Sequence, residues 1–212
     1  MSLFKTFIFI AIMLLLAGTV GSCNTQQRTG FFDLHPRILI HESDLGSGKN
    51  LQISVVDKRR RNILLRKDSD RKIKSGRALV TQDHHPSVKL DNHFQQTVEE
   101  AFQLQGYQTD GKGIGSVREV TIYITKLELR LRRTKAEGPD GQRQIQVRFR
   151  SKMKVAAKNQ GMTFGKDYEF FIKKSYDTLP SKQDNEKILN YGLTQLLHQI
   201  VNDPKLNRFL TG

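Results

Sequence analysis

The chain has 212 residues, of which 37% are hydrophobic, so it is long enough for one domain with a substantial core, or for two small domains at most. Its net charge of +14 favours anionic partners, although the basic residues are spread along the chain, so an ordinary solvated basic surface is an equal alternative. The single cysteine excludes an internal disulfide and a metal site built from several thiolates.

The first 23 residues have the pattern of a secretory signal. Lys5 precedes an uncharged apolar run, Phe7–Ala17, which small residues follow. This run is shorter than the about 20 apolar residues that a transmembrane helix needs. The sequence Val20-Gly21-Ser22-Cys23 resembles a bacterial lipobox, in which the cysteine thiol is lipidated and the cysteine becomes the first residue. We therefore expect a lipoprotein signal peptide over residues 1–22 and a lipid on Cys23.

Two alternatives to lipidation remain at this site. One is ordinary secretion, with Val20 and Ser22 as the small residues of a conventional cleavage site and Cys23 left free; the other is an uncleaved anchor. The only cysteine stands where lipidation needs it, which favours the lipoprotein. Asn24 follows it, where an Asp usually retains lipoproteins in the inner membrane. The resemblance to a lipobox therefore implies the outer membrane, with the protein facing the periplasm.

We expect a lipidated cysteine and tether over residues 23–35, and a single domain over residues 36–212. The domain begins with two predicted strands, over residues 37–40 and 51–56, and the second alternates apolar and polar residues. The segment 58–77 is strongly basic and is expected to form an exposed hairpin or loop.

A helix is predicted over residues 90–105 because apolar residues recur there at helical spacing. Asp91 is the expected N-cap, and Gly106 is the expected residue just beyond the helix. Residues 111–115 contain three glycines and suggest a phosphate loop, but they follow a helix and precede a strand, which is the reverse of that motif. A flexible connection is the favoured interpretation.

Three strands are expected next, over residues 120–131, 145–157 and 168–172, because apolar residues alternate in each. In the first strand this alternation changes parity near Thr125, which predicts a bulge or a change of buried face. Residues 137–141 and Gln160-Gly161 are expected turns between the strands.

The last part of the chain is predicted to be helical. A long helix begins at Ser181, with Asp184 placed for a capping box, and Asp203-Pro204 starts a short final helix. The order of elements predicts an α+β fold, in which a single antiparallel or mixed β-sheet carries two helices packed on one face.

A basic face on the middle strand is the main candidate for binding. The residues Arg148, Arg150, Lys152 and Lys154 project from one side of that strand, and Arg130 and Arg132 end the strand before it. We take these six residues, with segment 58–77, as a hypothetical site for a polyanion such as anionic lipid or glycan. An ordinary solvated sheet face is the alternative. Nucleic acid is a weaker candidate, because the sequence has no recognition module and an exported protein would rarely meet it.

The sequence gives no catalytic motif. His84, His85, Asp91 and His93 match no standard zinc spacing, and His198 stands beside the apolar face of the last long helix. We therefore expect no catalytic residues, no cofactor and no bound metal. An enzyme with a site hidden from sequence analysis is kept as a third hypothesis.

The chain resembles the YajG-like family of bacterial lipoproteins. The resemblance rests on the signal peptide, the strand LQISVVD, the helix that ends in FQLQGY, the strand 120–129 and the terminal helix. It implies a small envelope lipoprotein without an established activity, so only Cys23 carries over as a functional residue. Its expected partners are the membrane, through the lipid, and anionic envelope components or another envelope protein.

Overall fold

The computed structural model describes residues 30–60, 65–67, 84–86, 90–133 and 144–212. The signal peptide, Cys23, the expected turn 137–141 and most of segment 58–77 lie outside the described residues. In chain order, the elements are β1 (Gly30–Phe32), β2 (Lys49–Asp57), β3 (Leu65–Lys67), β4 (His84–Pro86), α2 (Leu90–Leu104), β5 (Ile114–Arg133), β6 (Ile145–Asn159), β7 (Met162–Tyr176), α3 (Lys182–Val201) and α4 (Pro204–Thr211).

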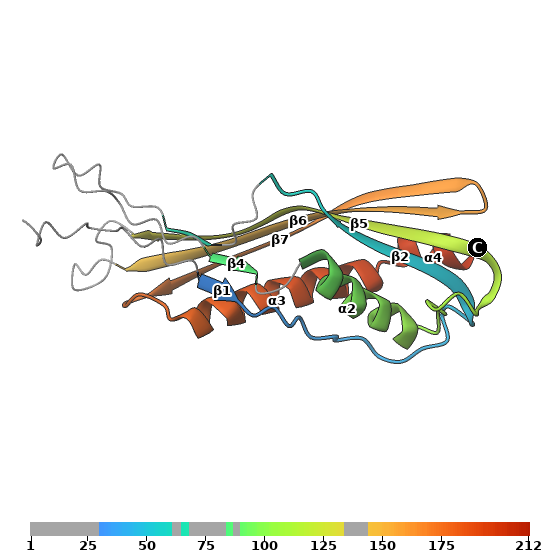
Figure 1. Cartoon of the computed structure of the whole chain (residues 1–212), viewed down its shortest axis with the longest axis horizontal. Coiled ribbons are helices and arrows are strands. Elements are labelled where there is room, and N and C mark those ends of the chain that lie inside the picture. Colours follow the sequence, from blue (N-terminus) through green and yellow to red (C-terminus); the bar gives the residue numbers. More distant parts are fainter. Residues whose placement is uncertain (1–29, 61–64, 68–83, 87–89, 134–143) are drawn as a thin grey trace, which may run out of the picture.

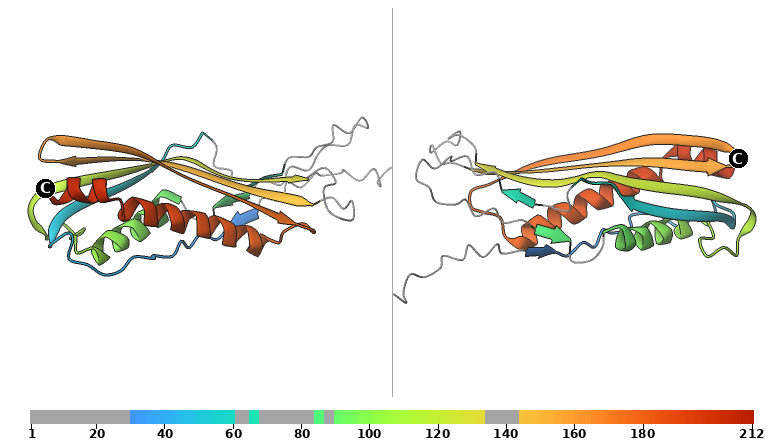
Figure 2. Two further views of the ribbon diagram at one scale, coloured as in Figure 1. Left: turned by 180° about the vertical axis from the view of Figure 1, so that it is seen from behind. Right: turned by 45° about the horizontal axis from the view of Figure 1, so that its top comes forward.

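The sheet is mixed and is organised around β5, its longest strand. One edge of β5 pairs with β2 and, further along, with β3, both in parallel. Its other edge pairs antiparallel with β6, which pairs antiparallel with β7. From β3 the sheet continues through β4 to β1. The helices lie beneath one face of this long twisted sheet (Figures 1 and 2), so the predicted α+β fold, with helices on one face, is confirmed.

The predicted bulge lies in β5. The pairing of β5 with β6 shifts register between Ile124 and Lys126. Ile124 is buried before the shift and Leu127 after it, so the extra residue keeps both halves of the strand facing the core. Thr125 is exposed at the bulge, and its hydroxyl donates a hydrogen bond to the Lys152 carbonyl oxygen at 3.0 Å.

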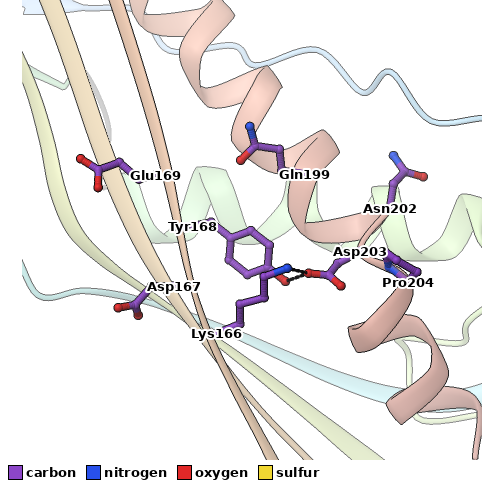
Figure 3. Close-up of a pocket in the computed structure, with 8 residues that line it drawn as sticks. All are labelled: Lys166, Asp167, Tyr168, Glu169, Gln199, Asn202, Asp203 and Pro204. Atoms are coloured by element: carbon purple, nitrogen blue, oxygen red, sulfur yellow. Dashed lines mark hydrogen bonds and ion pairs between the residues drawn. The ribbon is translucent and has the colours of Figure 1, made fainter.

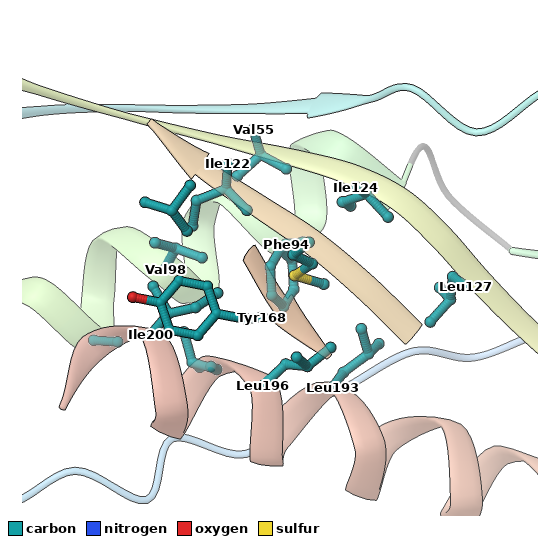
Figure 4. Close-up of a cluster of buried hydrophobic side chains, with 14 of the residues drawn as sticks. Val55, Phe94, Val98, Ile122, Ile124, Leu127, Tyr168, Leu193, Leu196 and Ile200 are labelled. Atoms are coloured by element: carbon teal, nitrogen blue, oxygen red, sulfur yellow. The ribbon is translucent and has the colours of Figure 1, made fainter. Parts of the chain in front are cut away.

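The core lies between the sheet and the helices (Figure 4). Residues Leu193, Leu196 and Ile200 of α3 point toward the sheet, where Ile122 and Tyr168 meet them. The closest approach is at Gly192, where an added Cβ would lie 1.9 Å from the Phe149 ring. This glycine therefore lets α3 pack directly on β6.

Helix α2 differs from its prediction at the start and agrees at the end. The helix begins at Leu90, so Asp91 is not the N-cap. Asp91 lies instead in the first turn, where a carboxylate interacts favourably with the positive end of the helix dipole. At the other end, Gly106 has a φ of 83°, and Tyr107 N–H donates to the Phe102 carbonyl oxygen at 3.1 Å. This is the Schellman arrangement, which requires a residue tolerant of positive φ at Gly106.

Helix α3 begins as predicted. Ser181 is the N-cap, and its side chain and that of Asp184 form the reciprocal hydrogen bonds of a capping box. The turn Gln160-Gly161 is also confirmed: both residues have positive φ, 49° and 82°, as a two-residue hairpin between twisted strands requires.

The predicted strand 37–40 is wrong, because this segment runs beside a helix instead of a strand. Residues 33–43 contain no regular element. The backbone N–H groups of Asp33, His35 and Arg37 donate to the side chains of Glu186, Asn190 and Thr194, at 2.9, 2.7 and 2.8 Å. Alternate residues of an extended chain repeat every ~6.6 Å, and residues four apart on a helix every ~6 Å, so the two periods match. We call residues 33–37 the strap.

The core also includes residues from the stretch expected to be a tether. Phe32 in β1 and Leu34 in the strap are both buried. Ile38 and Ile40 are half-buried against the same core, whereas Leu39 between them is exposed. The alternation that suggested a strand therefore reflects burial against the core and not pairing within the sheet.

Helix α4 closes one end of the molecule (Figure 1). Its last carbonyl groups have no partner within the helix, and side chains from three strands satisfy them. Asn159 of β6 donates to the Phe209 carbonyl oxygen at 2.7 Å, and the buried Arg118 of β5 donates to that of Leu210 at 2.6 Å. Lys49 of β2 donates to Thr211. Two of these donors are cationic, which suits the negative end of the helix dipole.

Candidate functional site

The face of β5, β6 and β7 that turns away from the helices carries the predicted basic residues. We call it the outer face. Arg148, Arg150 and Lys154 of β6 are exposed there, and Lys152 is half-exposed, while the residues between them are buried. On β5, Arg130 and Arg132 are exposed on the same face. The structure thus brings all six predicted residues onto one surface, as pairing of the two strands required.

Ion pairs divide this surface into two parts. Glu169 of β7 lies opposite Lys152 and accepts from Arg150 Nε at 2.6 Å, and Lys152 Nζ lies 3.5 Å from its other oxygen. The hydrogen bond from Arg150 lowers the pKa of Glu169, which keeps this carboxylate charged. Glu128 of β5 is paired in the same way with Arg130 and Lys126. The middle of the outer face is therefore a network of both signs.

Four cations gather toward the end of the sheet where β5 and β7 end and β6 begins, and one of them, Arg130, is the partner of Glu128. Arg148 lies directly opposite Arg130 on one side and Lys173 on the other. Opposite side chains on neighbouring strands have Cβ atoms about 5 Å apart, and like charges there are destabilising. Among the described residues, Arg132, Arg148 and Lys173 have no carboxylate within ion-pair distance. We call Arg130, Arg132, Arg148 and Lys173 the basic end.

Lys173 was not among the predicted residues. The strand β7 carries Asp167, Glu169, Phe171 and Lys173 on the outer face, so its charge pattern gives no basic stripe. Only the register of the strands shows that Lys173 faces Arg148. The same register places Arg66, in the described part of segment 58–77, opposite Arg130, so the two predicted basic regions meet at this end of the sheet.

A depression of about 320 Å³ lies on the opposite side of β7, at the junction of α3 and α4 (Figure 3). The carboxylate of Asp203, almost fully buried, accepts hydrogen bonds from Lys166 Nζ and from Tyr168 Oη, the latter at 2.6 Å. It also accepts from the N–H of Lys205 at 2.8 Å and caps α4. Burial alone would raise the pKa of Asp203, but these hydrogen bonds outweigh it and lower the pKa to about 2.

The same contacts make this depression a structural junction. Burial and the neighbouring Asp203 carboxylate raise the pKa of Tyr168, so the hydroxyl stays protonated and remains a donor. The buried groups satisfy one another, and Asp167 and Glu169 point away from the depression (Figure 3). A catalytic pocket would instead direct polar groups into the cavity.

The glycine-rich segment 111–115 has a structural role. The amide group of Asn50 accepts from the Gly113 N–H and donates to its carbonyl oxygen, both at 2.5 Å. A Cβ on Gly113 would lie 2.7 Å from the Asn50 side-chain oxygen, so the close approach requires glycine. The segment that resembled a phosphate loop is thus tied to β2.

The histidines do not form a metal centre in the described part of the chain, where no group of three His, Cys, Asp or Glu side chains could hold an ion. His93 packs edge-on against His35, with ring centroids 5.2 Å apart. His93 is half-buried in α2, so this packing gives it a structural role. No helix among the described residues is long and apolar enough to cross a membrane.

Comparison with known proteins agrees with this architecture. A family model described as "Uncharacterized lipoprotein" matches residues 36–211, which confirms the expected resemblance to YajG-like lipoproteins. No curated protein matches the chain. A crystal structure of a protein from Xanthomonas campestris is similar in fold, with a TM-score of 0.52 and 10% identity over 85% of this chain and 97% of that one.

Two further solved structures are more distant. A minor lipoprotein from Acinetobacter baumannii is 14% identical over 76% of this chain and 93% of its own, with a TM-score of 0.35. The rare lipoprotein B from Shewanella oneidensis is 12% identical over 74% and 96%, with a TM-score of 0.37.

Proposed function

Because the chain belongs to a family of uncharacterized lipoproteins, we propose that it is held in the envelope by a lipid on Cys23, faces the periplasm and acts by binding rather than by catalysis. The observation that carries the proposal is the family match together with the place of the only cysteine, directly after an apolar signal segment. The absence of Asp after Cys23 supports the outer membrane as its location.

The surface of the described domain supports a binding role. One face of the sheet packs on the helices, and the outer face is open and charged (Figure 2). The polar groups around Asp203 are engaged in holding α4, which leaves the outer face as the best candidate for contact with another molecule. An open charged face, together with polar groups that are engaged in structural contacts, fits an interaction or assembly module better than an enzyme.

The test of the anchor is the intact mass of the membrane-extracted protein, measured for wild type and for Cys23→Ser. We expect the wild type to have the mass of residues 23–212 plus acyl chains, and the variant to lack the acyl mass. An unmodified, soluble wild type that starts at or just after residue 23 would contradict the proposal and indicate ordinary secretion.

A second candidate function is the binding of a polyanion through the basic end. It is favoured by one observation: Arg148 lies between two other cations, Arg130 and Lys173, in register across three strands. Like charges directly opposite one another on neighbouring strands are generally destabilising, and an anion bound across the strands would offset such repulsion.

The polyanion hypothesis is tested with two variants that lose equal charge from the outer face. Arg148→Gln/Lys173→Gln removes two cations of the basic end, and Lys154→Gln/Lys158→Gln removes two from the other half of β6. We expect the first pair to elute from a heparin column at clearly lower salt than wild type, and the second to stay close to wild type. Equal retention of both variants and wild type would argue for an ordinary solvated face.

A further inference from the structure

The basic end lies at the same end of the molecule as the start of the described chain. Gly30 begins β1, which pairs with β4; β4 pairs with β3, and β3 pairs with β5 over Leu129–Leu131. Arg130 belongs to this last stretch. Figure 1 shows β1 in the half of the long axis toward which β5 and β7 end, whereas α4 and the C-terminus lie at the other end.

The length of chain between Cys23 and β1 limits how far this end can lie from a membrane. Gly30 is seven residues after Cys23, and even a fully extended chain spans at most about 25 Å over seven such steps. A lipid on Cys23 therefore keeps the β1 end of the sheet close to the bilayer. The α4 end, on the far side of long strands, is held away from it.

The charge at this end suits such a surface. Arg132, Arg148 and Lys173 lack a carboxylate partner among the described residues, while acidic Glu128, Glu169 and Asp167 lie further along the strands toward the α4 end. Phe171, two residues from Lys173 on the same face, is 56% exposed. Exposed aromatic and basic groups together are typical of surfaces that rest at the level of lipid headgroups.

We propose that the basic end docks on the anionic phospholipid headgroups of the leaflet that holds the lipid of Cys23, so that the domain stands on the membrane with α4 pointing away. This inference rests on the lipid anchor of the proposed function. It assigns the polyanion to the membrane surface itself and gives the domain a fixed orientation. Each cation held near an anionic bilayer strengthens binding about fivefold, so two of them contribute about 30-fold.

The orientation can be tested in the lipidated protein, because the lipid occupies the only native thiol. A cysteine introduced for exposed Ser175 labels the basic end, and one introduced for exposed Thr163 labels the same face of β7 near the α4 end. The two positions are 12 residues apart, or about 40 Å. Each labelled protein is placed in vesicles of phosphatidylcholine, alone or rich in phosphatidylglycerol, that carry a headgroup quencher.

We expect the fluorophore at Ser175→Cys to be quenched in the phosphatidylglycerol vesicles and the one at Thr163→Cys to stay unquenched. Adding Arg148→Gln/Lys173→Gln should abolish most of the quenching, and the matched Lys154→Gln/Lys158→Gln should preserve it. The equilibrium constant for docking should fall about 30-fold in the first variant, and high salt should also lower it for the wild type.

Three results would overturn the docking while leaving the anchor in place: quenching that is equal in neutral vesicles, equal quenching of both labels, or binding of soluble heparin by the basic end with no quenching on vesicles. Failure of the anchor itself is distinguishable, because the intact mass would then lack acyl chains and the protein would not remain with neutral vesicles.

Discussion

At the scale of single residues, Asp203 joins three parts of the molecule through one buried carboxylate. It caps α4, accepts from Tyr168 and pairs with Lys166. Its pKa in the folded protein, about 2, lies below the ordinary value of 3.8. A group with a lowered folded pKa stabilises the protein above its unfolded pKa and loses that contribution as the pH falls toward the folded pKa.

We therefore predict that Asp203→Asn lowers the free energy of unfolding by about 2 kcal/mol at neutral pH, because the pKa of Asp203 is about 2 in the folded protein instead of the ordinary 3.8. Wild type should lose this contribution between about pH 4 and pH 2, and the variant should show a flatter profile there. Urea unfolding at several pH values measures both. The exposed neighbour Asp167, changed to Asn, is the control and should keep the wild-type profile; a steep acid dependence retained by Asp203→Asn would contradict the assignment.

At the scale of elements, the strap shows how an extended segment can be stabilised without a sheet. Asn190 accepts from the His35 N–H and donates to the Asp33 carbonyl oxygen at 3.2 Å, so one helix side chain replaces a strand partner. We predict that Asn190→Ala costs about 1 kcal/mol of unfolding free energy, because water can reach the freed groups in part. Urea unfolding checks this value against Gln183→Ala, an exposed substitution on the same helix.

If Asn190→Ala unfolds like wild type, the strap is held by burial of Leu34 alone and not by the helix side chains. Protection of the His35 amide from hydrogen exchange gives an independent reading. It should fall in Asn190→Ala and stay unchanged in Gln183→Ala.

Elements defined by their own periodicity were predictable from the sequence. The strand β6 alternates along its length, α3 carries its capping box, and the parity change at Thr125 locates the bulge of β5. Elements defined by a distant partner were not: the strap alternates like a strand, but its N–H groups donate to side chains of a helix that lies 153 residues or more later in the chain.

In the candidate site, too, the sequence predicts what a single strand determines and misses what the pairing of strands determines. Alternation on β6 showed that four basic residues share a face, but the one acidic residue that pairs with two of them, Glu169, lies on β7, and its position is visible only in the register. Lys173 was missed for the same reason, because its relation to Arg148 is a property of the pairing and not of its own strand. The end of the sheet at which these cations gather is thus a tertiary feature.

At the scale of the whole molecule, the same three long strands connect the basic end with the end that holds α4. β5, β6 and β7 each run from the basic end to the end that α4 closes, and α3 lies beneath them (Figure 2). At the α4 end, the buried guanidinium of Arg118 holds the last turn of α4 to β5. Because the strands are continuous, we expect a substitution that destabilises one end of the sheet to lower the stability of the other end as well.

We predict that Arg118→Met lowers the free energy of unfolding by about 2 kcal/mol, the contribution of a buried hydrogen bond from a charged donor, and that unfolding remains a single transition. Far-ultraviolet circular dichroism and a fluorophore at Ser175→Cys, in a Cys23→Ser background, should give the same urea midpoint, although Ser175 lies at the opposite end of the sheet. The exposed α4 substitution Lys205→Met is the control, with a midpoint near wild type. If the dichroism signal fell before the Ser175 label responded, the α4 end would unfold separately, and the domain would consist of two units that the long strands fail to couple.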